Sequence, residues 1–185
     1  RGWTALEKAG LKDTFEPHSI PMYSRMIHQQ DGTVDVQAYG KEGEAIYSIS
    51  RGDLNKIMME VAEKEPTVNF HFNKKCLNVD FKETSLKFKD YKTKEEFEVK
   101  SDVILGTDGA FSAVRYNMQK TDRFSFSQDF LKHGYKELEI PAGPNGTHRI
   151  PTNHLHICPR EGFMLIALPN LDGSFTMTLF MAFEG

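Results

Sequence analysis

The sequence predicts a mixed α/β fold in which strand–helix segments alternate with an antiparallel sheet. An unbroken apolar run at residues 103–105 leads through a glycine-rich turn into a helix-compatible segment, as in α/β folds. From Tyr135 onward, apolar residues recur at every second position, which is typical of antiparallel strands. Because the two kinds of segment are interleaved along the 185 residues, we expect two structural layers, each built from non-contiguous segments of the chain.

The first 50 residues are expected to form one short helix and three strands. Apolar positions with helical spacing over residues 3–11 predict the helix, which ends near Gly10. The predicted strands are residues 22–27, 33–39 and 44–50. An Asp31-Gly32 turn joins the first two strands into a hairpin. Val34, Val36 and Ala38 alternate with polar residues, so this strand is expected to have one half-buried face.

A longer helix and several strands are expected in the middle of the chain. Apolar residues on one helical face predict a helix over residues 51–64, capped by Ser50 and Asp53. The run at 103–105 lacks polar alternation, which predicts a strand buried on both faces. The other predicted elements are strands at 68–72, 85–91 and 96–100 and a helix at 112–118.

Four strands are expected after residue 135, with a hairpin turn at residues 170–173. The apolar positions that define them are Leu138 and Ile140; Leu155 and Ile157; Met164, Ile166 and Leu168; and Phe175, Met177 and Leu179.

The composition excludes several classes of protein. The 23 basic and 26 acidic residues give a net charge of -3, so a general nucleic-acid binder is not expected. The longest apolar run, residues 163–168, is far shorter than the roughly 20 residues that span a bilayer. Cys76 and Cys158 fit no metal or redox spacing, and two reduced thiols indicate an intracellular protein.

The turn at residues 106–110, between the predicted strand and helix, is the strongest local signal of a site. Ligands of open α/β sheets bind beyond the carboxyl ends of the strands, where Asp108 is expected. Glycines allow a bulky ligand to approach the backbone, and the helix offers free N–H groups to a phosphate. A tight turn in which Asp108 only caps the helix explains the same pattern equally well.

Two arginines are further candidates. Arg51 stands at a helix N-terminus, where the helix dipole opposes it, so a phosphate or cofactor could be its partner. Arg25 and Tyr39 lie on paired strands and could together bind a carboxylate. The alternatives are an exposed arginine paired with a carboxylate for Arg51, and a surface cross-strand pair for Arg25 and Tyr39.

Metal and nucleophile sites are not expected. His154 and His156 are two residues apart, but the sequence offers no third ligand near them. No serine or cysteine stands at a Gly-x-Ser-x-Gly turn.

Four stretches together resemble a known family. Residues 106–115, Gly-Thr-Asp-Gly-Ala-Phe-Ser-Ala-Val-Arg, resemble the Asp-Gly motif of flavin-dependent aromatic hydroxylases, the class built like p-hydroxybenzoate hydroxylase. Residues 20–28, 48–56 and 153–180 resemble the kynurenine 3-monooxygenases within that class. The resemblance implies an FAD-binding Rossmann-like layer interleaved with an antiparallel substrate sheet. It also implies hydroxylation of L-kynurenine to 3-hydroxykynurenine with NADPH and O2, a step of tryptophan degradation.

The resemblance assigns roles to individual residues. No catalytic side chain is expected, because the flavin carries the reaction. Arg25 and Tyr39 match the positions that bind the substrate carboxylate. The matching pocket-wall positions are Ile46, Leu155, Ile157, Ile166, Leu168 and Phe180. The matching cofactor positions are Arg51 on FAD, Leu77 on its adenosine half, and Asp108 and Gly109 in the motif linked to the FAD pyrophosphate and NADPH.

The resemblance also divides the chain and sets it in a longer protein. Residues 1–15 and 48–118 are expected to belong to the FAD-binding domain, and residues 16–47 and 119–185 to the substrate sheet. The Gly-x-Gly-x-x-Gly fingerprint is expected upstream, and a Gly-Asp motif and a lid downstream. Membrane attachment is expected only through a C-terminal segment outside these residues, with a cytoplasmic location in bacteria and the mitochondrial outer membrane in eukaryotes. The residues leave two other functions open: another flavin-dependent hydroxylase and a non-catalytic β-rich binding module. They also leave open whether the protein forms a homodimer.

Overall fold

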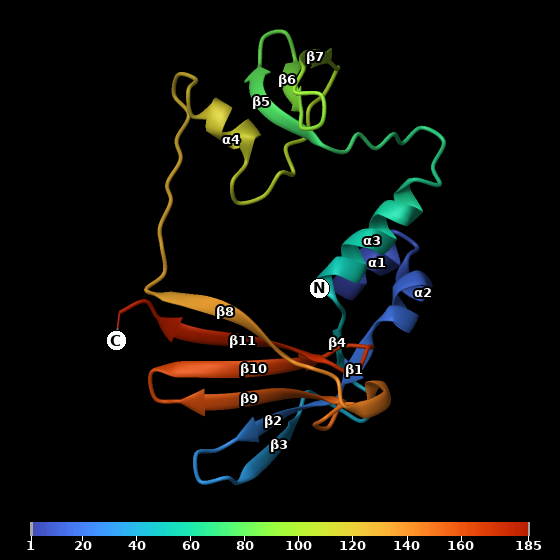
Figure 1. Cartoon of the computed structure of the whole chain (residues 1–185), viewed down its shortest axis with the longest axis vertical. Coiled ribbons are helices and arrows are strands. Elements are labelled where there is room, and N and C mark those ends of the chain that lie inside the picture. The colour runs from blue at the N-terminus through green and yellow to red at the C-terminus, as the bar shows by residue number, and fades with distance from the viewer. Residues whose placement is uncertain (1, 185) are drawn as a thin grey trace. The chain divides into compact units, whose positions relative to one another are not determined.

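The computed structural model describes residues 2–184, which divide into two compact units (Figure 1). Unit 1 takes the described residues up to Glu65 and those from Leu131 onward, and unit 2 is Pro66–Phe130. This division differs from the predicted FAD-binding and substrate domains, whose end residues Arg1 and Gly185 lie outside the described part. The predicted domain assignment therefore stays a prediction.

A six-stranded sheet forms most of unit 1, in the order β3-β2-β9-β10-β11-β8 (Figure 1). Its strands are β2 (Ser24–His28), β3 (Val34–Ala38), β8 (His133–Ile140), β9 (His154–Arg160), β10 (Phe163–Pro169) and β11 (Phe175–Ala182). All neighbours pair antiparallel except β2 and β9, which run parallel. The predicted hairpins around Asp31-Gly32 and residues 170–173 are confirmed, as are the strands predicted after residue 135.

The rest of unit 1 is a small helical part with a two-stranded sheet. β1 (Ile20–Met22) pairs with β4 (Ile46–Ser48). The helices are α1 (Gly2–Lys8), α2 (Lys12–Phe15) and α3 (Arg51–Ala62), with short 3-10 turns η1 (Glu16–His18) and η2 (Pro144–Gly146). The predicted cap of α3 is confirmed for Ser50, whose Oγ accepts from the Asp53 N–H at 3.3 Å. Phe15, Met22 and Phe175 are buried in the core of this unit.

Residues that face each other across neighbouring strands lie on the same side of the six-stranded sheet. The pairs Arg25–Leu155, Ile27–Ile157, Ile157–Ile166 and Ile166–Thr178 therefore define one side, which we call the Arg25 face. The pairs Ser24–His154, Met26–His156 and His156–Ala167 define the other side, the His156 face.

The prediction of a half-buried face on residues 33–39 is wrong. Every residue of β3 is exposed, and Val36 remains 57% exposed. β3 is an edge strand of its sheet. An edge strand is buried only if another layer covers it. Alternation alone therefore did not decide burial.

Unit 2 is a three-stranded antiparallel meander with one helix. β5 (Lys74–Asp80), β6 (Ser85–Asp90) and β7 (Glu96–Lys100) are neighbours in this order, and α4 (Ala113–Met118) contacts β5. The predicted strands at 85–91 and 96–100 and the helix at 112–118 are confirmed.

Two predicted strands of unit 2 are absent from the described structure. Residues 68–72 form a loop in which the rings of Phe70 and Phe72 stack on each other at 5.8 Å. Residues 103–105 are not in a strand, and Leu105 is 82% exposed instead of buried. A strand requires hydrogen bonds from a neighbour, and among residues 2–184 neither segment pairs with one. Both predictions are therefore wrong.

No helix within residues 2–184 combines the length and apolar character that crossing a membrane requires.

Candidate functional site

Arg25 and Tyr39 meet on the Arg25 face. The Tyr39 N–H donates to the Tyr23 carbonyl at 3.0 Å, which extends the β2–β3 pairing by one residue. Arg25 and Tyr39 are therefore diagonal neighbours, and the guanidinium carbon lies 4.8 Å from the centre of the phenol ring. The Tyr39 hydroxyl is buried and has no hydrogen-bond partner among the described residues. A guanidinium beside an unused hydroxyl can bind a carboxylate.

The predicted wall residues of the six-stranded sheet lie on this same face. Leu155 is directly opposite Arg25, and Ile157 is opposite Ile166. The other members of this set are Leu168, opposite Thr176, and Phe180, opposite Met164 and Tyr135. The Arg25 face therefore combines one cation with a row of half-buried apolar side chains, which suits a flat ligand that carries a carboxylate.

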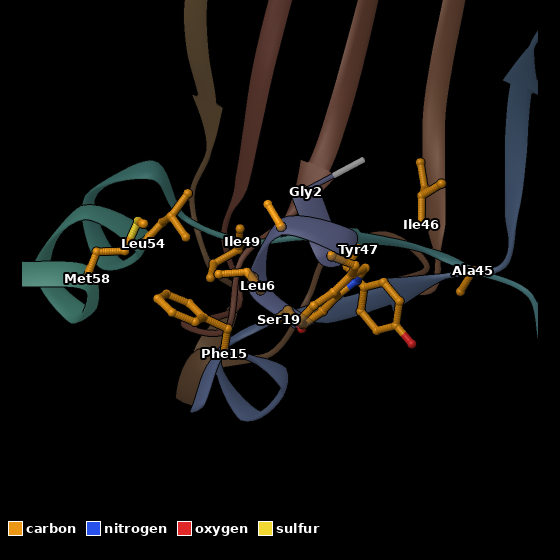
Figure 2. A pocket seen from close by; sticks show the side chains of 12 residues that line it. Gly2, Leu6, Phe15, Ser19, Ala45, Ile46, Tyr47, Ile49, Leu54 and Met58 are labelled. Atoms are coloured by element: carbon orange, nitrogen blue, oxygen red, sulfur yellow. The ribbon is translucent and has the colours of Figure 1, made fainter. Parts of the chain in front are cut away.

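Ile46 is placed elsewhere. It lies opposite Met22 in the β1–β4 pair, not in the six-stranded sheet. It lines an apolar cavity of about 510 Å³ together with residues of α1, α2 and α3, such as Leu6, Phe15 and Leu54 (Figure 2). The described structure thus does not bring Ile46 into one sheet with the other wall residues, and its role stays a prediction.

Arg51 lines a polar cavity of about 740 Å³ between the N-terminus of α3 and the Arg25 face. Among residues 2–184, no carboxylate pairs with Arg51, so the predicted alternative of an ion-paired arginine is not what the structure shows. Leu168 reaches the same cavity. The cavity also takes in residues that the sequence analysis missed: Glu137, Glu139, Thr176 and Thr178.

Two of these missed residues, Thr176 and Thr178, carry a signal in the sequence. Thr176 and Thr178 alternate with apolar Met177 and Leu179, which shows that two polar side chains share a face of β11. Glu139 and Glu137 lie opposite them on β8. Only the strand order brings β8 next to β11.

In unit 2, Asp108 caps α4. Its carboxylate accepts hydrogen bonds from Ser112 Oγ at 2.6 Å and from the N–H groups of Ala113 and Val114 at 2.7 and 3.2 Å. These bonds, chiefly the one from Ser112, hold the pKa of Asp108 below its ordinary value of 3.8. The structure thus shows the capping role that the sequence analysis kept as an alternative.

The turn that follows Asp108 is open. Gly109 has a φ of +77°, and no heavy atom lies within 4 Å of where a Cβ would stand. Arg115 donates to the carbonyl oxygens of Gly109 and Ala110, and these two bonds hold the turn to α4. A bulky phosphate group could therefore approach this backbone closely.

Leu77 lies at a β-bulge. The register between β5 and β6 shifts between Cys76 and Asn78, so Leu77 has no directly paired residue. A bulge leaves its extra residue unpaired. The Leu77 backbone is therefore available for a contact such as the predicted one to the adenosine half of FAD.

No group of three or more histidine, cysteine, aspartate or glutamate side chains within residues 2–184 is arranged to hold a metal ion.

Comparisons with known proteins agree with this arrangement. A sequence profile described as "FAD binding domain" matches residues 2–165. The chain belongs to the FAD binding domain family. FAD is the cofactor of this family, as the resemblance of the sequence implied.

Two relatives that match this FAD binding domain over its whole length share one name. A kynurenine 3-monooxygenase of Flavobacterium johnsoniae is 49% identical over 185 residues, which are 100% of this chain and 41% of the relative. A kynurenine 3-monooxygenase of Dictyostelium discoideum is 47% identical over 186 residues, which are 100% of this chain and 40% of the relative. The chain thus spans about two fifths of the length of these relatives.

Solved structures confirm the fold class of this FAD binding domain. A 2-methyl-3-hydroxypyridine-5-carboxylic acid oxygenase superposes with a TM-score of 0.71 at 19% identity, over 100% of this chain and 47% of the other. A probable FAD-dependent monooxygenase from Pseudomonas aeruginosa superposes with a TM-score of 0.67 at 13% identity, over 98% and 48%. At these identities the likeness shows the fold alone. It is the predicted α/β fold of the p-hydroxybenzoate hydroxylase class.

The described residues fit FAD. Arg51 offers an unpaired guanidinium beside a cavity, which suits a phosphate or a polar edge of the flavin. In unit 2, the open turn at Gly109 and the unpaired backbone at Leu77 suit close contacts with phosphate and adenosine groups. The carboxylate of Asp108 holds this turn to α4 through its hydrogen bonds, and its predicted link to the FAD pyrophosphate and NADPH stays a prediction.

Proposed function

We propose that the chain is part of a kynurenine 3-monooxygenase, which hydroxylates L-kynurenine with NADPH and O2. Relatives with this name are 42–49% identical to the chain over 99–100% of its length. The observation that carries the proposal is the Arg25–Tyr39 pair above a row of apolar side chains. L-kynurenine combines a flat aromatic ring with an amino-acid carboxylate, which matches both parts of this face.

Arg25 and Tyr39 hold the substrate by its carboxylate. The guanidinium supplies charge and two parallel donors, and the hydroxyl of Tyr39 supplies a further donor that has no other described partner. Because the hydroxyl is already buried, its desolvation cost is met before the substrate binds. The carboxylate therefore gains a preorganised site.

The apolar side chains of the Arg25 face position the aromatic ring. Leu155, Ile157, Ile166 and Leu168 are half-buried and alternate on β9 and β10. Their rigid strands fix the distance between the ring and the carboxylate site. Their apolar surface also keeps water from the ring.

The chemistry requires a cofactor, because protein side chains by themselves do not activate O2. FAD, when bound, supplies the transfer of one oxygen atom from O2, with NADPH as the reductant. Arg51 would hold FAD at the N-terminus of α3; this is supported by the cavity that Arg51 lines together with Leu168, Thr176 and Thr178.

The test is made on the full-length protein that carries this chain. With FAD, NADPH and L-kynurenine, we expect the protein to consume O2 and to form 3-hydroxykynurenine. An oxygen electrode measures the first, and chromatography detects the second. NADPH oxidation that ignores L-kynurenine but responds to a phenolic acid would make the protein another flavin-dependent aromatic hydroxylase. Purified full-length protein without bound flavin and without oxidase activity would favour a binding module instead.

A further inference from the structure

The His156 face carries a row of polar side chains that joins β2 to β9. Ser24 Oγ and His154 Nδ1 are 2.6 Å apart, and His28 Nε2 and His156 Nδ1 are 2.8 Å apart. His156 is 2% exposed and Ser24 is 5% exposed, so water reaches these bonds poorly. The rings of His28 and His156 also stack, with centres 5.1 Å apart. Two side-chain bonds therefore reinforce this strand pair on the side away from Arg25.

The partners of His156 fix the position of its proton. His156 Nε2 lies 2.7 Å from the carbonyl oxygen of Pro151, which can only accept, so Nε2 donates. In the neutral ring Nδ1 is then an acceptor, and His28 Nε2 must donate to it. With both rings neutral, the bond between the two histidines therefore runs from His28 Nε2–H to His156 Nδ1.

The strand pair that these bonds join is the one that places Arg25. Among the described strands, β2 and β9 form the one parallel pair of the six-stranded sheet, and parallel pairing is slightly weaker per residue. Arg25 follows Ser24 directly and projects to the opposite face, next to Leu155. Any loosening of β2 on β9 would shift the guanidinium relative to the apolar row.

We propose that His156 and His28 are positioning residues for the substrate carboxylate: their hydrogen bond holds β2 on β9 and thereby holds Arg25 beside Leu155. The proposal rests on the proposed function, because it takes Arg25 as the carboxylate-binding group. Neither histidine touches the substrate, since both lie on the His156 face.

The groups around His156 favour the neutral form of its ring. Burial lowers the pKa of His156 below its ordinary value of 6.5, and His28 and His154 lower it further. β10 and β11 present Ala167 and Phe175 to the ring, neither of which titrates, and Arg160 donates to the carbonyl of His28 at 3.0 Å. The stabilisation by neutral His156 is thus fully present above pH 6.5 and is lost as the pH falls toward the lowered pKa.

The experiment measures the dissociation constant of L-kynurenine by isothermal titration calorimetry. The full-length, FAD-loaded protein is used without NADPH, so that no turnover occurs. For His156→Phe at about pH 8, where the lowered pKa keeps the wild-type ring of His156 neutral, we expect the constant to be about tenfold higher than for the wild type.

Two further variants sharpen the test. His28 is half-buried at the end of its strand, so His28→Gln keeps the test possible if His156→Phe does not fold. The matched control is His148→Phe: this ring also packs on Phe175, at 5.5 Å, but bonds to the Asn170 carbonyl and not to β2. We expect His28→Gln to behave like His156→Phe, and His148→Phe to behave like the wild type.

A substrate analogue separates positioning from general destabilisation. For the kynurenine analogue that lacks the carboxylate, the dissociation constant should be the same in the wild type and in both variants. Equal weakening of this analogue, or wild-type affinity of His156→Phe and His28→Gln for L-kynurenine, would overturn the positioning role alone. A wild type that binds no L-kynurenine at all would overturn the proposed function, and the positioning role with it.

Discussion

Arg25 shows how one residue acquires a role from its neighbours. An exposed arginine on a strand usually contributes little to the stability of a protein by itself. Here the guanidinium lies 4.8 Å from the ring of Tyr39, whose hydroxyl has no described partner. Both groups can therefore turn toward an incoming carboxylate without first losing another bond.

Replacement of Arg25 should weaken substrate binding specifically. For Arg25→Ala in the full-length protein, we expect the dissociation constant of L-kynurenine to rise roughly 10- to 150-fold, because a charge-assisted bond of about 1.5–3 kcal/mol is lost. Gln37→Ala is the matched control, since Gln37 lies directly opposite Arg25 on the exposed strand β3. Titration calorimetry measures both. If Arg25→Ala bound L-kynurenine with unchanged affinity, Arg25 would be a surface residue without a role in substrate binding.

At the scale of elements, the turns of the fold depend on glycine. Gly173 in the β10–β11 hairpin has a φ of +88°, and a Cβ there would overlap the carbonyl group of Gly146 in η2. This contact, together with the bond from His148 to the Asn170 carbonyl at 2.8 Å, packs the hairpin turn against the η2 segment.

Gly173→Ala should therefore destabilise the protein more than its backbone conformation alone explains. We expect a loss of about 2–5 kcal/mol in the free energy of unfolding, from left-handed strain and from overlap. Gly32→Ala has the same φ of +88° with open space around it, so it should cost only about 1–2 kcal/mol. Urea unfolding compares the two variants. Equal losses would mean that the hairpin does not pack on η2.

The cap of α4 gives a second prediction for an element. Asp108→Asn removes the charge that accepts three hydrogen bonds at this helix, so we expect a loss of about 1 kcal/mol near neutral pH. The lowered pKa of Asp108 means that this stabilisation is present above pH 3.8 and is lost as the pH falls through the folded-state value. The difference between the wild type and the variant should therefore shrink in acid.

Asp102→Asn is the control for this cap, because Asp102 is an exposed carboxylate in the same unit. Urea unfolding of both variants near pH 7 and near pH 3 makes the comparison. A loss for Asp108→Asn that is the same at both pH values would contradict the role of the charge.

At the scale of the whole molecule, FAD should stabilise the fold. A ligand that binds only the folded state adds about 2.7 kcal/mol at one hundred times its dissociation constant. We expect removal of FAD to lower the melting temperature of the full-length protein, and added FAD to restore it. An identical melting temperature with and without FAD would contradict this.

Arg51 should contribute to this effect. For Arg51→Ala, we expect the dissociation constant of FAD to rise about tenfold or more, because an unpaired guanidinium beside the cavity is removed. Lys56→Ala is the control on the same helix: its side chain is 73% exposed and pairs with Glu60 at 3.7 Å. Flavin fluorescence on titration measures both constants. Equal affinities would place FAD away from α3.

Local patterns predicted much of the fold. The capped helix α3, the β2–β3 and β10–β11 hairpins and the alternation in β8 to β11 are all encoded within a few neighbouring residues. The same holds for the Arg25–Tyr39 pair, since a hairpin fixes its own register. The residues at 106–115 likewise predicted the turn before α4, although not whether Asp108 caps the helix or serves a ligand.

Long-range pairing decided the rest, because no local pattern encodes which strands become neighbours. The sheet order sets β2 beside β9, which places Arg25 next to Leu155 and brings His28 to His156. It also sets β8 beside β11, which adds Glu137 and Glu139 to the cavity of Arg51. Long-range pairing also explains why the strand predicted at 103–105 is absent. Its apolar run suits a buried strand, but a strand also needs hydrogen bonds from a neighbouring strand. By itself the sequence determined the family, the turns and the candidate residues, and only the tertiary structure decided which of them share a face.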